Sequence, residues 1–149
     1  MGRLLKFWSL PRREKEFLCE ASILLFVSSA SVKAIPFRHI DRFLRTRWNG
    51  GIQGEIDHEE EIRLVKHSIS RAANVLPWKS LCLSRSIAQF IMLRRRGIPA
   101  TLFLGVRFSG HSSLDAHAWV DTGPGENDKS FERSAFSIVT RIGTRAVDL

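Results

Sequence analysis

Apolar residues recur every three or four positions through the first hundred residues, and after that they alternate with polar ones. The first pattern is typical of amphipathic helices and the second of half-buried strands. Proline and glycine separate the segments. The pattern predicts helices from Pro11 to the residue before Pro36, over 37–47, from about Asp57 to the residue before Pro77, and over 81–96. It predicts strands over 100–108, 114–121, 127–132 and 135–141.

Helices followed by an antiparallel meander of strands indicate the α+β class. The stretch 48–56 is rich in glycine and is the best candidate for a boundary. We therefore expect an N-terminal helical arm over 1–48 and a main domain over 57–149. In the arm, Phe43 is expected on the buried face, and Arg38, Arg42 and Arg45 on the polar face.

The helix predicted at 81–96 places Cys82 in its first turn. Ser80 is a natural N-cap, Gly97 a natural residue after the last turn, and Pro99 prevents continuation. A helix N-terminus favours the thiolate form of cysteine, which is the nucleophilic form. Its unsatisfied backbone N–H groups can also bind an oxyanion. The alternative is that Cys82 is only a small buried residue, which is how we interpret Cys19 in the first helix.

His117 is the histidine best placed to act as a base, because it lies between small residues on a predicted strand. A Cys–His pair is one of the arrangements that activate a nucleophile. The other histidines are His39, His58 and His67 on charged helices, and His111 in a turn. If Cys82 and His117 meet in space, the protein is an acyl-transfer enzyme, with a cysteine protease as the first choice.

A third group is expected to orient the imidazole. Three aspartates compete for this role, namely Asp115, Asp121 and Asp128. Strand alternation places Asp121 on the His117 face. A four-residue turn after Asp121 places Asp128 on the same face, diagonal to His117. Geometry alone leaves Asp121 and Asp128 as close rivals.

The composition says more about the partners of the protein than about its fold. The net charge of +8 favours an acidic partner, but no nucleic-acid-binding motif accompanies it, so we expect no nucleic acid. Two distant cysteines supply no disulfide framework and indicate a reducing cytoplasmic setting. The uncharged run 21–32 is shorter than the about 20 residues of a membrane span. No cofactor motif or metal-ligand spacing is present, and Arg94 to Arg96 are interpreted as a solvated helix end.

At these residues the sequence resembles the leader peptidases of lasso-peptide biosynthesis, which are transglutaminase-like cysteine proteases. The resemblance covers most of the chain and rests on several motifs together. They are Pro11 to Glu16, Ile35 to Phe37, Pro77-Trp78, Ser80 to Ser86, Leu93 to Ala100, Leu104 to Val106 and Ala116 to Val120.

The resemblance implies a papain-like core in which the catalytic cysteine is Cys82 and the histidine is His117. The family's aspartate commonly follows an asparagine, and Asn127-Asp128 matches this pattern, so Asp128 is preferred over Asp121. It also implies a precursor peptide cut at its leader–core junction, a separate leader-recognition protein and an ATP-dependent macrolactam synthetase as a further partner. The rivals are a basic adaptor without catalysis that binds peptide, nucleic acid or membrane, and a transamidase or deamidase on the same fold.

Overall fold

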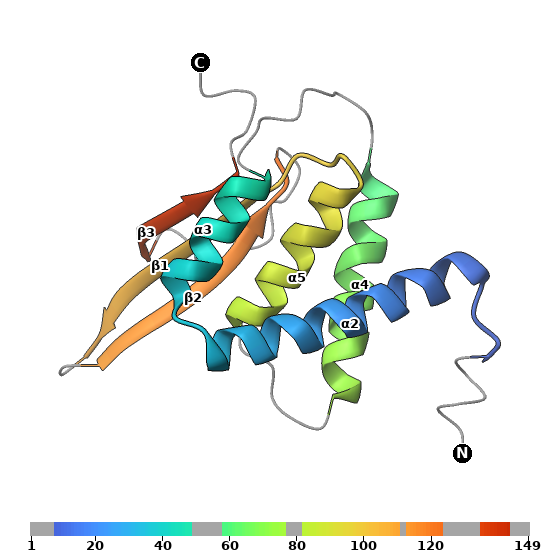
Figure 1. The fold of residues 1–149 in the computed structure, drawn as a ribbon, viewed down its shortest axis with the longest axis horizontal. Helices are drawn as coiled ribbons and strands as arrows, with labels where there is room; N and C mark the ends of the chain where they lie inside the picture. Colours follow the sequence, from blue (N-terminus) through green and yellow to red (C-terminus); the bar gives the residue numbers. More distant parts are fainter. Residues whose placement is uncertain (1–7, 49–57, 77–81, 111–112, 124–134, 144–149) are drawn as a thin grey trace.

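The computed structural model describes residues 8–48, 58–76, 82–110, 113–123 and 135–143. Within them the elements follow the order α2 (Arg12–Ala34), α3 (Phe37–Trp48), α4 (Glu59–Val75), α5 (Cys82–Arg95), β1 (Thr101–Ser109), β2 (Ser113–Asp121) and β3 (Ser137–Ile142). Helices precede an antiparallel sheet (Figure 1), which confirms the α+β class. The predictions that fall on Asp57, Ser80, His111, the strand 127–132 and Asp128 lie outside the described residues.

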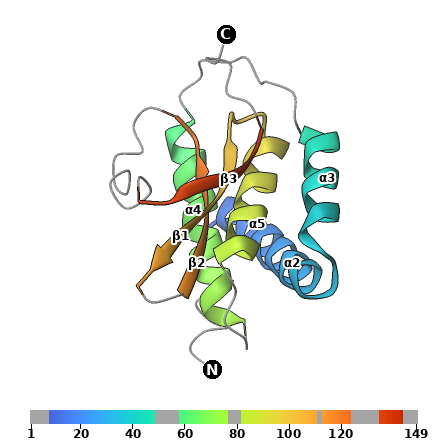
Figure 2. The same cartoon turned by 90° about the vertical axis from the view of Figure 1, so that its left-hand side faces the viewer.

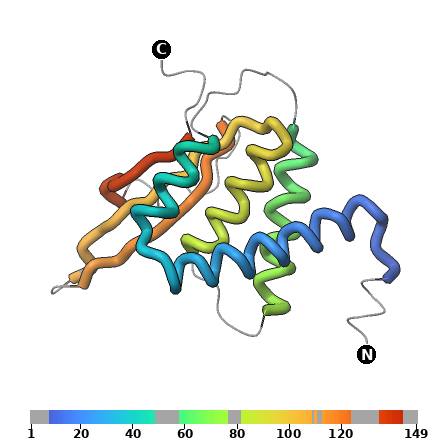
Figure 3. Tube along the Cα trace, viewed as in Figure 1, coloured from blue at the N-terminus to red at the C-terminus, as the bar shows by residue number. Residues whose placement is uncertain are grey.

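Helix α2 is the longest described helix and lies across α4 and α5. The Cα trace in Figure 3 follows this crossing, and the side view in Figure 2 places α2 and α3 on the same side of α5. Phe17, Ala21, Leu25 and Ser28 lie on its buried side, at the three- to four-residue spacing of an amphipathic helix. Pro36 and the extended backbone of Ile35 end the helix.

Helix α5 is fixed at its C-terminal end by a Schellman motif. Gly97 has a φ of 71°, a left-handed conformation that favours glycine. Its N–H donates to the carbonyl of Arg94, and the N–H of Ile98 donates to that of Leu93. The predicted termination of this helix at Gly97 is therefore confirmed.

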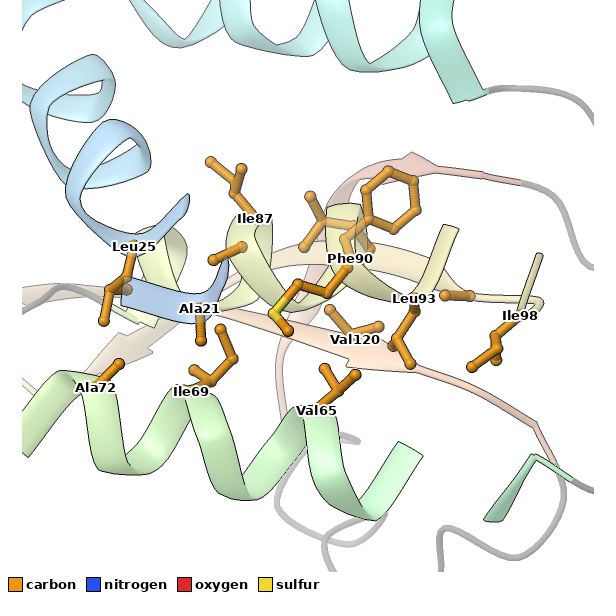
Figure 4. Packing of buried hydrophobic residues seen from close by; sticks show 14 of the residues in the cluster. Ala21, Leu25, Val65, Ile69, Ala72, Ile87, Phe90, Leu93, Ile98 and Val120 are labelled. Carbon is orange, nitrogen blue, oxygen red and sulfur yellow. The ribbon is translucent and has the colours of Figure 1, made fainter. Parts of the chain in front are cut away.

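One hydrophobic core joins the helices to the sheet. Figure 4 shows side chains of α2, α4 and α5 converging with Val120 of β2. Phe90, Leu93 and Met92 of α5 are fully buried at its centre. Ile40 and Leu44 of α3 belong to the same cluster. The helices of the first 48 residues are thus packed into the core that supports the sheet.

The order of the strands differs from the predicted meander. β1 lies in the middle of the described sheet, with β2 on one side and β3 on the other, all antiparallel. β3 carries Ile142 into the core opposite Leu102. The hydrophobic pattern marks this strand as half-buried but does not say which strand it pairs with. The order of the strands could therefore not be predicted from the sequence.

Three side chains lie elsewhere than predicted. Cys19 is exposed on α2 rather than packed, and Phe43 is exposed and meets Trp48 edge to face. Arg94 is only 6% exposed, not solvated. Its Nη2 donates to the carbonyl of Trp48 at 2.6 Å, at the last residue of α3. Burial lowers the pKa of Arg94, because the interior disfavours the charged form.

By length and composition, α2 is long enough and apolar enough to cross a membrane. It is 23 residues long, so it extends well beyond the uncharged run inside it. Its other side exposes Ile23, Phe26 and Val27. The helix therefore combines one face in the core with one apolar face on the surface.

Candidate active site

Cys82 is the first residue of α5, and its side chain lies against β2. The sulfur is 4.0 Å from the carbonyl oxygen of Ala116, a long S–H···O contact. The thiol is partly exposed. The predicted position of Cys82 at the start of a helix is therefore confirmed.

His117 follows directly on the carbonyl that meets the thiol. Standard peptide geometry then places its Cα within about 7 Å of the Cys82 sulfur, given the 4.0 Å contact. His117 is exposed and belongs to β2, as predicted. The structure therefore brings the predicted nucleophile and the predicted base to neighbouring positions at one end of α5.

Ser86 holds this end of the helix in register with the strand. Its hydroxyl, one turn after Cys82, donates to the carbonyl of Ala118 at 2.9 Å and is buried. Residues four apart share one side of a helix, and alternate carbonyls of a strand point the same way. Cys82 therefore contacts the carbonyl of Ala116, and Ser86, one helical turn later, contacts the carbonyl of Ala118.

The imidazole of His117 lies in an aromatic cluster formed by Phe103, His117, Trp119 and Phe136. Its ring is 6.0 Å from that of Trp119 and 5.5 Å from that of Phe136, measured between centroids. Trp119 in turn stacks on Phe103 at 5.5 Å. By strand alternation, this cluster lies on the face of the sheet opposite that of Ala116 and Ala118, so the imidazole and α5 lie on different faces.

Gly105 makes room for this cluster. It pairs with His117 across the two strands. A Cβ atom at this position would lie 2.9 Å from Cβ of Phe136 and 3.0 Å from the ring of Trp119. A glycine inside a strand commonly marks such a close approach, so the residue is explained by the packing around the histidine.

Two of the three rival aspartates have other partners. Asp115 pairs with Arg107 across the hairpin, at 3.0 Å from Nη2. Asp121 accepts the backbone N–H of Gly123 at 3.0 Å, so it helps to form the turn that follows β2. Asp121 is also four residues from His117, about 13 Å along a strand. Among the residues that the structure describes, no three His, Cys, Asp or Glu side chains gather to hold a metal ion.

The chain, with a cysteine at a helix start near a histidine on a strand, was compared with known protein families. The family model of the transglutaminase-like superfamily matches residues 25–140. This chain belongs to the transglutaminase-like superfamily. Many members of the superfamily are cysteine-dependent enzymes, among them proteases and transamidases. Neither the curated proteins nor the solved structures gave a match.

The sequence predicted Cys82 and His117 as candidates, and the structure adds neighbours of these two residues that the sequence did not single out. Ser86 could have been found from its spacing of four from Cys82. Gly105 is an isolated glycine in an apolar strand, which is a signal of close approach. Phe136 gave no local signal, because its contact with His117 depends on the order of the strands.

Proposed function

We propose that this protein is a cysteine endopeptidase that removes the leader from a ribosomally made lasso-peptide precursor. The single observation that supports it best is the contact of the Cys82 thiol with the carbonyl directly before His117. Membership of a superfamily of cysteine-dependent enzymes supports the same chemistry. The sequence resemblance to leader peptidases supplies the substrate.

In the proposed reaction, the sulfur of Cys82 attacks the carbonyl carbon at the leader–core junction. His117 accepts the thiol proton and then gives a proton to the leaving amine of the core peptide. The leader is left as a thioester on Cys82. Water, deprotonated by His117, hydrolyses this thioester and releases the leader acid and the free thiol. Backbone N–H groups in the first turn of α5 stabilise the oxyanion.

His117 needs to turn from the aromatic cluster toward the sulfur for this transfer. Hydrogen bonds of catalytic groups often tighten only when substrate binds. Strand alternation places the imidazole on the face of the sheet opposite α5, so the transfer requires the ring to swing around β2, which is an edge strand of the described sheet.

Asp128 is the proposed third member, and Asp121 is the matched control. We expect Asp128→Asn to lower kcat by up to about 10⁴-fold, as loss of an orienting aspartate does in serine proteases. Asp121→Asn should keep kcat within a few-fold, because this carboxylate serves the turn at Gly123. Rates of precursor cleavage check both. The opposite ranking would assign the role to Asp121.

The surface of α2 and α3 is the proposed docking site for a separate leader-recognition protein. α2 exposes Ile23, Phe26 and Val27, and α3 exposes Arg38 and Arg42. Figure 2 shows α3 on the side of α5 away from α4, while α2 crosses both α4 and α5. Apolar and basic side chains together suit a partner with an acidic rim around an apolar centre.

Charge reversal tests this surface. We expect Arg38→Glu with Arg42→Glu to weaken partner binding and to slow association, because opposite charges across an interface steer encounter. Arg45 is excluded from the set, since it bonds Asp41 and Thr140 and so joins α3 to β3. Lys66→Glu on α4 serves as the control. Titration by calorimetry at two salt concentrations measures the effect, and unchanged binding in the double variant would remove α3 from the site.

Mass spectrometry of a precursor incubated with the protein and its recognition partner tests the reaction itself. Hydrolysis gives two fragments whose masses sum to the precursor plus one water. A deamidase gives one product with an amide exchanged for an acid, and a transamidase gives a product that has lost ammonia. An adaptor leaves the precursor unchanged. Only the first pattern agrees with the proposal.

A further inference from the structure

We propose that the outer half of the β1–β2 hairpin is a substrate subsite that binds an apolar side chain next to the scissile bond. Phe108 and Leu114 form this subsite, and it rests on the proposed peptidase function of Cys82. The side chains are 84% and 58% exposed.

Strand pairing places the two side chains on the α5 side of the sheet. Leu114 pairs with Phe108, and Ala116 pairs with Val106. Every second residue of a strand shares a face, so Leu114 lies on the same face as Ala118 and Val120. Those two are buried under α5.

The covered part of this face ends where α5 begins. Figure 1 shows the hairpin continuing beyond the first turn of α5, and Figure 2 shows the same overhang from the side. The apolar face therefore continues from the core, past the thiol, and onto an uncovered surface at Leu114 and Phe108.

The spacing from the thiol fits a peptide substrate. The Cys82 sulfur is 4.0 Å from the carbonyl of Ala116. Leu114 is two residues further along the strand, which is about 7 Å. An extended peptide advances by the same length in two residues. A substrate side chain about two residues from the attacked carbonyl therefore contacts Leu114 and Phe108.

The two faces of the hairpin differ in polarity. On the opposite face at this level, Arg107 and Asp115 form an ion pair. The face beside the thiol carries only apolar side chains at the pairs 106↔116 and 108↔114. Exposed apolar side chains that adjoin one another on an uncovered sheet face often mark a binding site, and the thiol next to them makes an extended peptide the fitting occupant.

The test uses the precursor cleavage assay with Phe108→Ser and Leu114→Ser. Each variant is expected to lower kcat/KM by roughly 10–100-fold, mainly through KM, because an apolar subsite contributes this much discrimination. Phe108→Leu and Leu114→Ile should retain activity. Val75→Ser, at a site 69% exposed on α4, is the matched control and should be neutral. A cooperative thermal unfolding transition confirms that each variant is folded.

A second set of variants changes the precursor peptide instead of the protein. Each of the three residues on either side of the cut is changed in turn to aspartate. The wild-type protein should lose most kcat/KM at one position, and the Phe108→Ser, Leu114→Ser double variant should lose this discrimination. Cleavage that depends on Cys82 but is indifferent to both serine variants overturns the subsite alone. Absence of any Cys82-dependent cleavage overturns the proposed function and the subsite with it. A change of oligomeric state with unchanged cleavage assigns the surface to self-association and also overturns the subsite.

Discussion

Replacing Cys82 by alanine removes cleavage of the precursor, with an expected loss in kcat on the order of 10⁶-fold, as for a catalytic nucleophile. The reason is that the thioester can form only on this sulfur. Binding of the precursor and the recognition partner should be retained, because Cys82 occupies one small position at the start of α5. Fragment formation followed by mass spectrometry measures the loss.

Cys19→Ala is the matched control for this variant. The chain has two cysteines, and Cys19 is exposed on α2. Because its side chain is exposed on a helix other than α5, its replacement should leave the cleavage rate unchanged. Full activity of Cys82→Ala together with loss in Cys19→Ala would reverse the assignment.

Replacing His117 by alanine is the second large expected loss, of roughly 10⁴-fold in kcat, the upper range for general acid–base catalysis. The thiol proton then has no acceptor and the leaving amine no donor. His117→Gln should be as inactive, while it preserves more of the contact with Trp119 and Phe136. Single-turnover cleavage rates measure both variants.

His67→Ala is the control for the histidine, because His67 is exposed on α4. Near-wild-type cleavage by His67→Ala together with loss in both His117 variants separates a catalytic role from a general effect of losing an imidazole. If the His117 variants cleave at the wild-type rate and melt at a lower temperature, the residue supports the aromatic cluster and another group is the base.

The sequence predicted most of what is local. Helix α5 shows this best, because its N-terminal cysteine and its end at Gly97 follow from short-range signals. The helices α2 and α4 followed from the spacing of their apolar residues. These features depend on residues within a few positions of one another, so a single sequence contains them.

What the sequence did not predict depends on contacts between distant segments. The pairing of β3 with β1 is set by tertiary packing, and so is the contact of Phe136 with His117. Arg94 looked like part of a solvated basic run, yet it binds the end of α3 at Trp48. Cys19 lies in an apolar helix whose second side is on the surface, and apolar composition could not tell the two sides apart.

The central claim is that Cys82, and not Cys19, is the nucleophile that attacks the leader–core junction. The most direct measurement is to treat the protein, with its recognition partner, with the leader peptide ending in a chloromethyl ketone, and to map the alkylated residue by mass spectrometry. The account predicts a single label on Cys82, slowed in His117→Ala and blocked by intact precursor. A label on Cys19, or none on Cys82 in a preparation that cleaves the precursor, would contradict it.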